Sequence, residues 1–536
     1  MKASTTIYAP DHDKPPRGKM VRRLVLAATA LFFTSCSMAP FSEPSNKFSR
    51  EDATALFSAG LDTIRLYYVA EPDIPRMVLR GLNGLTELDP EFHAERDGEA
   101  VKLIYRNAPV AVLTAPPDKD VVRWSYLIAA ALETARLKSP DIAATDLERT
   151  YQVVFNAALA DLDRFSRYQS AKDAQSSRAH RQGYSGIGIS LGKRDEIITV
   201  REVFENTPAA EARIQIGDSI HRIDGVEVIG WALDKVVPVL RGSPGSQVDL
   251  TLVRNKKILP VSLIRREVIE QTVFTTLTNN SAVIRVTGFN EQTSLRMREH
   301  IDTARETLGD SLNGVVLDLR GNRGGMLDEA VNLADLFMPN GTILTTVGRH
   351  DNAQQNFRAE PNDNAEQLPL VVLIDSGSAS ASEVVAAALQ DSGRGLLIGA
   401  RSYGKGSVQR VRDLPNNGAL NLTWATMRAP SGYSLSRFGV FPTICTGGKG
   451  VTAPTMLKKI RRGEVLTANL GPLRRNAESL DPRSQSRLLQ RCADQPRTGE
   501  AEDTDLDLAL GLLAEPVLYK RVTEYAVLAM QRQPGD

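Results

Sequence analysis

The chain has 536 residues, which corresponds to about three or four domains of typical size. Hydrophobic residues make up 42% and charged residues 24%, with 39 Gly and 28 Pro, so global disorder and collagen-like or low-complexity structure are excluded. The net charge of +1 argues against nucleic acid as a partner, because phosphate binding requires excess positive charge. With three Cys, six His and neither an H-E-x-x-H nor a C-x-x-C motif, we expect no disulfide scaffold, no metal and no cofactor.

Residues 1–35 are predicted to be a signal peptide. Residues 19–23 carry three positive charges, residues 24–33 are nearly all apolar, and small residues precede Cys36. The apolar run is about ten residues, whereas a membrane-spanning helix needs about 20. The small residues before Cys36 resemble the lipobox of bacterial lipoproteins, which implies an acylated Cys36 on the periplasmic side of a bacterial membrane; plain secretion is the alternative. Residues 36–50 are predicted to form a tether.

Two further cysteines lie near the carboxyl end of the chain. Export would place Cys445 and Cys492 in an oxidising compartment, where they can form a disulfide. Two buried free thiols are the alternative, and the sequence does not decide between them.

Residues 51–179 are predicted to form a mostly helical amino-terminal region. Between Val122 and Leu137, apolar residues recur every three to four positions, as on the buried face of a helix. The segments Val101 to Tyr105 and Val110 to Leu113 are predicted to form a hairpin. We interpret residues 51–179 as a helical cap or an oligomerisation region.

The rest of the chain divides into three parts. Residues 183–268 are rich in short strands and turn residues, which predicts a small β-rich domain. Residues 270–447 alternate strands and helices, which predicts a layered α/β core. Residues 448–536 form a carboxyl-terminal region with a last helix over residues 505–513. The predicted fold class is therefore α+β and multidomain.

A candidate nucleophile follows a buried strand of the predicted core. The strand LPLVVLID leads into SGSAS and a helix, so Ser380 lies near a helix amino terminus, where unpaired N–H groups favour negative charge. Attack by Ser380 on a carbonyl group could be supported by the N–H of Ala381. The alternative is that serine only caps the helix. Glu383 is expected to be a first-turn acid that complements the helix dipole.

A candidate base lies in the segment RSYGKGSVQR. Lys405 stands between two glycines, which permit close backbone approach and leave little side chain to solvate the amine. A desolvated lysine has a lowered pKa and can accept a hydroxyl proton, whereas a lysine in a solvated turn, the alternative here, stays charged. In an extended segment Lys405 and Gln409 share one face, so the Gln409 amide can hold the amine.

Together these motifs resemble a known enzyme family. GSASASE, the YGKGSVQ segment that follows it, VVLDLRGNRGG, LDRFSRY and MRAPSGYS are similar to the carboxyl-terminal processing peptidases, or tail-specific proteases. The resemblance implies a core of the ClpP/crotonase-like type, a Ser380 nucleophile, a Lys405 base and a Gln409 that orients Lys405. It also implies an oxyanion hole from the N–H groups of Ala381 and of Gly324 or Gly325.

The β-rich segment resembles a PDZ domain. The run YSGIGI, at Gly186, Ile187, Gly188 and Ile189, is similar to the loop with which such domains bind a terminal carboxylate, and the following strand would pair with the peptide. A β-barrel with a glycine turn is the alternative interpretation of this segment.

The leading hypothesis is a secreted serine endopeptidase that binds the carboxyl-terminal tails of exported proteins through its PDZ domain and cleaves them with a Ser-Lys dyad. A non-enzymatic PDZ adaptor of the cell envelope is the alternative hypothesis. The expected partners are proteins or peptides with exposed tails, and a membrane through Cys36. An activator or adaptor protein and an oligomeric assembly are left open, including an enzyme that a partner or a PDZ ligand must realign.

Overall fold

The computed structural model describes residues 47–361, 365, 367–446, 451–464, 475–492 and 503–531. The predicted signal peptide and Cys36 lie outside these residues. From Phe48 onward the chain forms one compact unit, Phe48–Asp536. None of the helices in the described ranges is long and apolar enough to cross a membrane.

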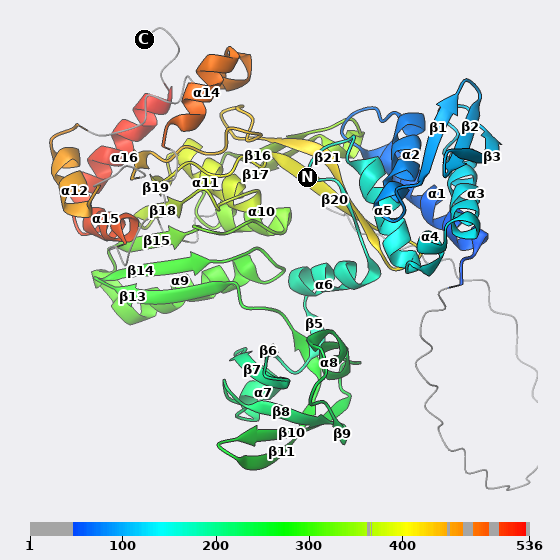
Figure 1. Ribbon diagram of the computed structural model, residues 1–536. Helices are drawn as coiled ribbons and strands as arrows, with labels where there is room; N and C mark the ends of the chain where they lie inside the picture. The colour runs from blue at the N-terminus through cyan, green and yellow to red at the C-terminus, as the bar shows by residue number, and fades with distance from the viewer. Residues whose placement is uncertain are drawn as a thin grey trace, which may run out of the picture. The chain divides into compact units, whose positions relative to one another are not determined.

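The first folded part consists of helices beside a small antiparallel sheet (Figure 1). Its helices are α1 (Arg50–Tyr67), α2 (Ile74–Asn83), α3 (Val121–Lys138), α4 (Pro140–Ala144) and α5 (Leu147–Leu159). The helix predicted from apolar spacing is confirmed as α3, and its periodic side chains, from Trp124 to Leu132, are buried. These helices share one hydrophobic core with the sheet, as expected when an apolar helix face needs a partner.

The small sheet contains β1 (Phe92–Asp97), β2 (Ala100–Tyr105) and β3 (Ala108–Thr114) in that order. The predicted hairpin is confirmed, since β2 and β3 pair antiparallel. Arg106 and Asn107 form its turn, and both have positive φ, as a two-residue type I′ turn requires. The strand β1 is not expected from the sequence, because only its first half alternates buried and partly exposed side chains.

The β-rich segment folds into a sheet with the strand order β11-β10-β8-β7-β6, and β9 pairs with β8. Its strands are β6 (Ile189–Arg194), β7 (Ile197–Val203), β8 (Ser219–Ile223), β9 (Val226–Glu227), β10 (Gln247–Arg254) and β11 (Lys257–Ile264), and its helices are α7 (Pro208–Glu211) and α8 (Leu233–Leu240). A short ladder of β5 (Tyr184–Gly186) and β12 (Arg266–Val268) joins the two ends of the segment. The strand β6 is an edge strand, which leaves its outer backbone groups open to a further strand.

The predicted layered α/β core is confirmed. Its sheet has the strand order β13-β14-β15-β18-β19-β22, and all neighbours from β14 onward are parallel. The strands are β13 (Val273–Thr278), β14 (Ser281–Val286), β15 (Gly314–Asp318), β18 (Leu370–Ile374), β19 (Leu396–Gly399) and β22 (Ile444–Cys445). Every residue of β15 and β18 is buried, as in parallel strands that are covered on both faces.

Helices cover both faces of this core sheet (Figure 1). One face packs against α9 (Thr293–Leu308), α10 (Leu327–Asp335) and α11 (Ala381–Asp391). The other packs against α12 (Ala453–Arg461), α15 (Thr504–Leu513) and α16 (Pro516–Gln531). The predicted helix over residues 505–513 is confirmed as α15, but it is not the last helix, because α16 follows it. The carboxyl-terminal region therefore completes the core.

A second sheet connects the core to the amino-terminal helices. Its order is β17-β16-β21-β20, and β4 also pairs with β21. The strands are β4 (Arg167–Gln169), β16 (Thr342–Val347), β17 (Gln355–Arg358), β20 (Ser407–Asp413) and β21 (Ala419–Arg428). Leu420 and Leu422 of β21 lie in the hydrophobic core of the amino-terminal helices. The β20–β21 hairpin thus extends from the Lys405 segment into that helical region.

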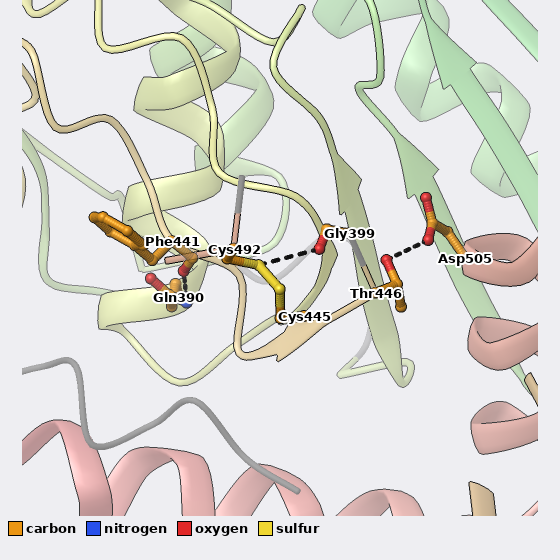
Figure 2. Close-up of a disulfide and its surroundings, with 7 residues drawn as sticks. All are labelled: Gln390, Gly399, Phe441, Cys445, Thr446, Cys492 and Asp505. Carbon is orange, nitrogen blue, oxygen red and sulfur yellow. Dashed lines mark hydrogen bonds between the residues drawn. A yellow bond between two sulfur atoms is a disulfide. The ribbon is translucent and has the colours of Figure 1, made fainter. Parts of the chain in front are cut away.

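Cys445 and Cys492 form a disulfide, which resolves the alternative that the sequence left open (Figure 2). Cys445 lies in the edge strand β22, and Cys492 follows α14 (Pro482–Gln490). The bond joins residues 47 positions apart. The backbone carbonyl of Cys492 accepts a hydrogen bond of 2.9 Å from Arg401 N–H, at the start of the segment that carries Lys405.

Replacing both cysteines with alanine, Cys445→Ala/Cys492→Ala, is expected to lower the free energy of unfolding by about 2–4 kcal/mol, because the unfolded chain loses its cross-link. Urea denaturation followed by circular dichroism measures this change. Dithiothreitol should destabilise the wild-type protein and leave the double variant unchanged. Two free thiols in the denatured, unreduced wild type, beyond that of Cys36, would contradict the disulfide.

Candidate active site

Ser380 lies where the loop after β18 enters α11. Its φ of 57° and ψ of −113° lie outside the regions that L-residues prefer, and such a backbone persists only when neighbouring contacts hold it. The Ser380 N–H donates to Glu383 Oε2 at 2.8 Å. The preceding Ala379 N–H donates to the carbonyl of Asn322 at 2.9 Å. The turn that presents Ser380 is therefore held from both sides.

Lys405 lies in the segment between β19 and β20, and both flanking glycines are needed there. A Cβ atom on Gly404 would lie 2.7 Å from the carbonyl oxygen of Arg437, and one on Gly406 would lie 2.1 Å from Ser436 N. The structure thus confirms close backbone approach as the reason for glycine on each side. The Lys405 ammonium nitrogen lies 5.3 Å from the centroid of the Phe165 ring.

Burial lowers the pKa of Lys405. The positive charge of Arg167 lowers it further, and the carboxylates of Glu383 and Asp163 oppose both effects. The environment of Lys405 therefore favours the neutral amine more than solvent does, as a base requires.

The segments of Ser380 and Lys405 border one cleft of about 390 Å³, which we call the Ser380 cleft. Its lining includes Ser380, Ala381, Lys405, Gln409 and Gly325. Gly325 and Gln409 are 84 positions apart in the sequence, and the structure brings both to this one cleft. Among the described residues, Lys405 Nζ makes no hydrogen bond to the Ser380 hydroxyl, and the catalytic roles of both remain predictions.

Gln409 lies in β20, next to a bulge in its pairing with β21 between Val408 and Gln409. Its amide nitrogen donates to Ser407 Oγ and to Thr423 Oγ1, each at 3.3 Å. The Gln409 side chain therefore lines the Ser380 cleft, but its amide nitrogen donates to Ser407 and Thr423 and not to Lys405.

Gly324 approaches the amino terminus of α11 closely. A Cβ atom on Gly324 would lie 2.9 Å from Ser380 Cβ and 3.0 Å from Ala381 N. The N–H of Ala381 belongs to the first turn of α11, where N–H groups have no partner within the helix. The N–H of Gly324 donates to Asn322 Oδ1 at 2.8 Å, which favours Gly325 over Gly324 as the second donor to an oxyanion.

Glu383 has a larger role than the helix-dipole role predicted for it. Its carboxylate is fully buried and accepts hydrogen bonds from Ser380 N–H, Ser402 Oγ, Gly404 N–H and Lys405 N–H, at 2.5 to 2.9 Å. Burial raises its pKa, and these four hydrogen bonds oppose that increase. One buried carboxylate thus connects the Ser380 turn to the Lys405 segment.

The sequence contains a signal for half of this arrangement. A serine followed three residues later by glutamate is a capping-box pattern, and it predicts the contact from Glu383 to Ser380 N–H. Nothing in the local pattern indicates the contacts to residues 402–405. Asn322 is also buried and contacts both Gly324 and Ala379, and no local sequence pattern indicates these contacts.

A second groove lies in the β-rich domain, between the edge strand β6 and helix α8. This β6–α8 groove has a volume of about 260 Å³ and includes the apolar side chains of Ile187, Ile189, Leu191, Val237 and Leu240. Of the four residues predicted to bind a tail, Ile187 and Ile189 line it. Gly186 instead pairs with β12 through β5, and Gly188, with a φ of +83°, packs against Thr207.

Arg241 also lines the β6–α8 groove, together with the charged side chains of Glu202 and Glu270, and no sequence motif indicates it. Its guanidinium lies 4.5 Å from the centroid of the Tyr184 ring. Its Nε atom is buried without a hydrogen-bond partner among the described residues. Apolar side chains beside a guanidinium group suit a peptide tail that ends in a carboxylate.

Two family models match the chain. The model of peptidase family S41 matches residues 280–446, and the PDZ domain model matches residues 185–264. The first range contains Ser380, Lys405 and Gln409, and the second contains most residues that line the β6–α8 groove.

Curated relatives match over more than half of the chain. A carboxy-terminal-processing protease of Bartonella bacilliformis is 36% identical over 313 residues, which cover 58% of this chain and 72% of the relative. The carboxy-terminal processing protease CtpA of Bacillus subtilis is 28% identical and covers 58% of this chain and 66% of the relative.

Solved structures also match parts of the chain. A photosystem II D1 C-terminal processing protease is 28% identical, with a TM-score of 0.34 over 60% of this chain and 85% of that chain. The PDZ domain of a carboxy-terminal protease from Vibrio cholerae, in complex with a peptide, is 31% identical, with a TM-score of 0.15 over 16% of this chain and 96% of that chain.

The substitution Glu383→Gln is expected to slow the reaction of Ser380 with a fluorophosphonate probe by about 10²-fold, since a misplaced nucleophile costs a factor of this order. The substitution replaces one buried carboxylate oxygen with an NH2 group, which then faces other hydrogen-bond donors. The free energy of unfolding should therefore also fall by about 1–3 kcal/mol. Labelling kinetics and urea denaturation measure the two effects.

Glu329→Gln provides the matched control, because Glu329 is also buried and accepts a backbone N–H, that of Ser294, which belongs neither to the Ser380 turn nor to the Lys405 segment. It should lower stability and leave labelling unchanged. Equal labelling rates in wild type and Glu383→Gln would contradict the positioning role of Glu383.

Proposed function

The chain belongs to the carboxy-terminal processing proteases of peptidase family S41, and from this premise we propose that it is an exported endopeptidase that cleaves other exported proteins near their carboxyl-terminal tails. It is a serine-type peptidase with a PDZ domain that binds peptides. In the proposal, Ser380 is the nucleophile and Lys405 the general base.

The observation that carries the proposal is the composition of the Ser380 cleft. A serine at a helix amino terminus, a lysine with a lowered pKa and a glycine turn lie around one cavity. This set of groups can perform acyl transfer without histidine.

In the acylation step, the neutral Lys405 amine removes the proton of the Ser380 hydroxyl while Oγ attacks the scissile carbonyl carbon. The N–H groups of Ala381 and Gly325 stabilise the resulting oxyanion. When the tetrahedral intermediate collapses, the C–N bond breaks and the Lys405 ammonium protonates the leaving amine. Lys405 then accepts a proton from water, whose oxygen attacks the ester, and Ser380 recovers its proton.

Gln409 would orient Lys405 in this scheme. Because its amide contacts Ser407 and Thr423, the scheme requires a rotation of the Gln409 and Lys405 side chains when a peptide enters the cleft. Such a realignment by a partner or a PDZ ligand is part of the proposal.

The β6–α8 groove would select the substrate. A peptide tail can add as a strand to the edge strand β6, with its last side chain among the apolar residues and its carboxylate near Arg241. The signal peptide, the acylation of Cys36 and the periplasmic location complete the proposal, and all three concern residues outside the described structure. Since the chain is a serine-type peptidase, the adaptor alternative is not supported.

Ser380→Ala and Lys405→Ala are each expected to abolish cleavage of an unstructured protein with an exposed tail, because each removes a reacting group. Gel electrophoresis over time measures cleavage, and circular dichroism verifies the fold. Lys102→Ala, at a partly exposed lysine of β2 that pairs with Asp97, is the control and should retain activity. Cleavage by purified Ser380→Ala at the wild-type rate would reject the assignment.

The pH dependence tests the same base. Because burial, and then the charge of Arg167, lower the pKa of Lys405, activity is expected to rise with pH and to reach its plateau at a lower pH than an ordinary lysine would allow. It should decrease as the pH falls below that pKa, where the protonated amine cannot accept the Ser380 proton. A value of kcat/KM that is constant down to about pH 5, where only carboxylates begin to titrate, would contradict Lys405 as the base.

Ile189→Asp is expected to weaken binding of a tail peptide by on the order of tenfold, because it removes apolar contact and places a carboxylate beside the tail carboxylate. Fluorescence anisotropy with the Ser380→Ala protein measures the affinity. Ile258→Asp, an exposed position on β11 at the opposite edge of the same sheet, is the control. Unchanged affinity in Ile189→Asp would show that the tail binds elsewhere.

A further inference from the structure

The Ser380 cleft has a one-sided charge distribution. Five of its lining residues carry a basic side chain: Arg167, His180, Arg181, Arg323 and Lys405. No aspartate or glutamate lies among the residues that line it. This contrasts with the whole chain, in which acidic and basic residues are almost equal in number.

Three separate elements supply the arginines. Arg167 comes from β4, Arg181 from α6 (Ala171–Gln182) and Arg323 from the turn after β15. Their arrangement around one cleft is therefore a product of the tertiary structure and not of a local basic run in the chain.

These three arginines have no carboxylate partner in the described part of the chain. Elsewhere in the same region arginines are paired: Arg178, one helical turn before Arg181, forms an ion pair of 2.7 Å with Asp413. Helix α6 thus directs one arginine to a carboxylate of the protein and another to the cleft. Burial lowers the pKa of Arg181, with a further contribution from Arg178 and with the carboxylate of Asp413 opposing both, so an incoming anion would be favourable there.

We propose that the Ser380 cleft selects peptide segments that carry a carboxylate next to the scissile bond, with Arg181 and Arg323 as its specificity-determining residues. The inference rests on the proposed function of the cleft. Guanidinium groups bind carboxylates through paired hydrogen bonds, and a cleft with one sign of charge also speeds the approach of an oppositely charged segment.

The position of Arg323 indicates where such a carboxylate lies. Arg323 directly precedes Gly324 and Gly325, the turn expected to contact the scissile carbonyl. A carboxylate bound by Arg323 therefore belongs to a residue close to that carbonyl. Its source is either an Asp or Glu side chain or the free carboxyl terminus of a short peptide.

Arg167 is a poor test site, because its charge lowers the pKa of the proposed base Lys405. The variants are therefore Arg181→Gln and Arg323→Gln, with Arg178→Gln as the control on the same helix.

The experiment measures kcat/KM of the full-length protein for peptides that share one tail and carry Asp, Asn or Lys beside the cleavage site. For the wild type we expect the order Asp, Asn, Lys, with about a tenfold advantage of Asp over Asn, the size of a close charge pair. Each arginine variant should reduce this ratio, and Arg178→Gln should preserve it. High salt should also reduce the ratio of kcat/KM between the Asp and Asn peptides.

A second pair of peptides, with neutral flanks and an end two residues beyond the cleavage site, is compared as free acid and as amide. A free-acid preference that is lost in Arg181→Gln or Arg323→Gln, with no Asp preference in the first series, assigns the site to the chain terminus. A side-chain preference alone assigns it to Asp or Glu. Both results support a carboxylate site in the cleft.

Equal kcat/KM for all charges in the wild type, or a ratio that both arginine variants leave unchanged, would overturn the inference. Failure of the proposed function has a different signature, namely cleavage of every peptide by Ser380→Ala. If turnover is too slow to measure, anisotropy with the Ser380→Ala protein gives the same comparison of the peptides. The same order of affinities would support the inference, and equal affinities would overturn it.

Discussion

The buried carboxylate of Glu383 is the interaction on which the rest of the cleft depends. It accepts hydrogen bonds from the backbone of Ser380 on one side and of Gly404 and Lys405 on the other. A carboxylate in a buried environment is unfavourable unless such donors surround it. Because the four donors come from two segments of the chain, Glu383 stabilises the arrangement that brings the serine and the lysine to one cavity.

Charge around this cavity has two connected effects. Removal from water and the neighbouring charge of Arg167 both disfavour the protonated form of Lys405. The same positive field attracts a carboxylate. The positive charge of the cleft therefore favours both the neutral form of the base and the binding of an acidic substrate segment. Both effects are strongest at low ionic strength, where salt screens the charges least.

The Ser380 cleft is also connected to parts of the molecule that contain no proposed catalytic group. The strand β21 places Leu420 and Leu422 in the core of the amino-terminal helices, while the paired strand β20 carries Gln409 into the cleft. At the other end of the Lys405 segment, the backbone carbonyl of Cys492 accepts a hydrogen bond from the Arg401 N–H. The amino- and carboxyl-terminal regions thus both contact the segment whose position decides the reach of the proposed base.

Local sequence patterns were sufficient for much of the protein. The 3.6-residue period of α3, the turn between β2 and β3, and the strand-loop-helix pattern around Ser380 depend on residues that are neighbours in the chain, and the structure confirms these elements. The glycines beside Lys405 likewise indicated close backbone approach. Recognition of the family combined several such local motifs.

Only the tertiary structure decided how these segments meet. The pairing of Cys445 with Cys492 and the contacts of Glu383 with residues 402–405 join segments that are not adjacent in the sequence. The register of β20 against β21 likewise places Gln409 opposite Thr423. The cationic lining of the cleft arises in the same way from three separate elements. A residue's own neighbours determine its backbone preference, but its burial and partners depend on packing between distant segments, which no local period records.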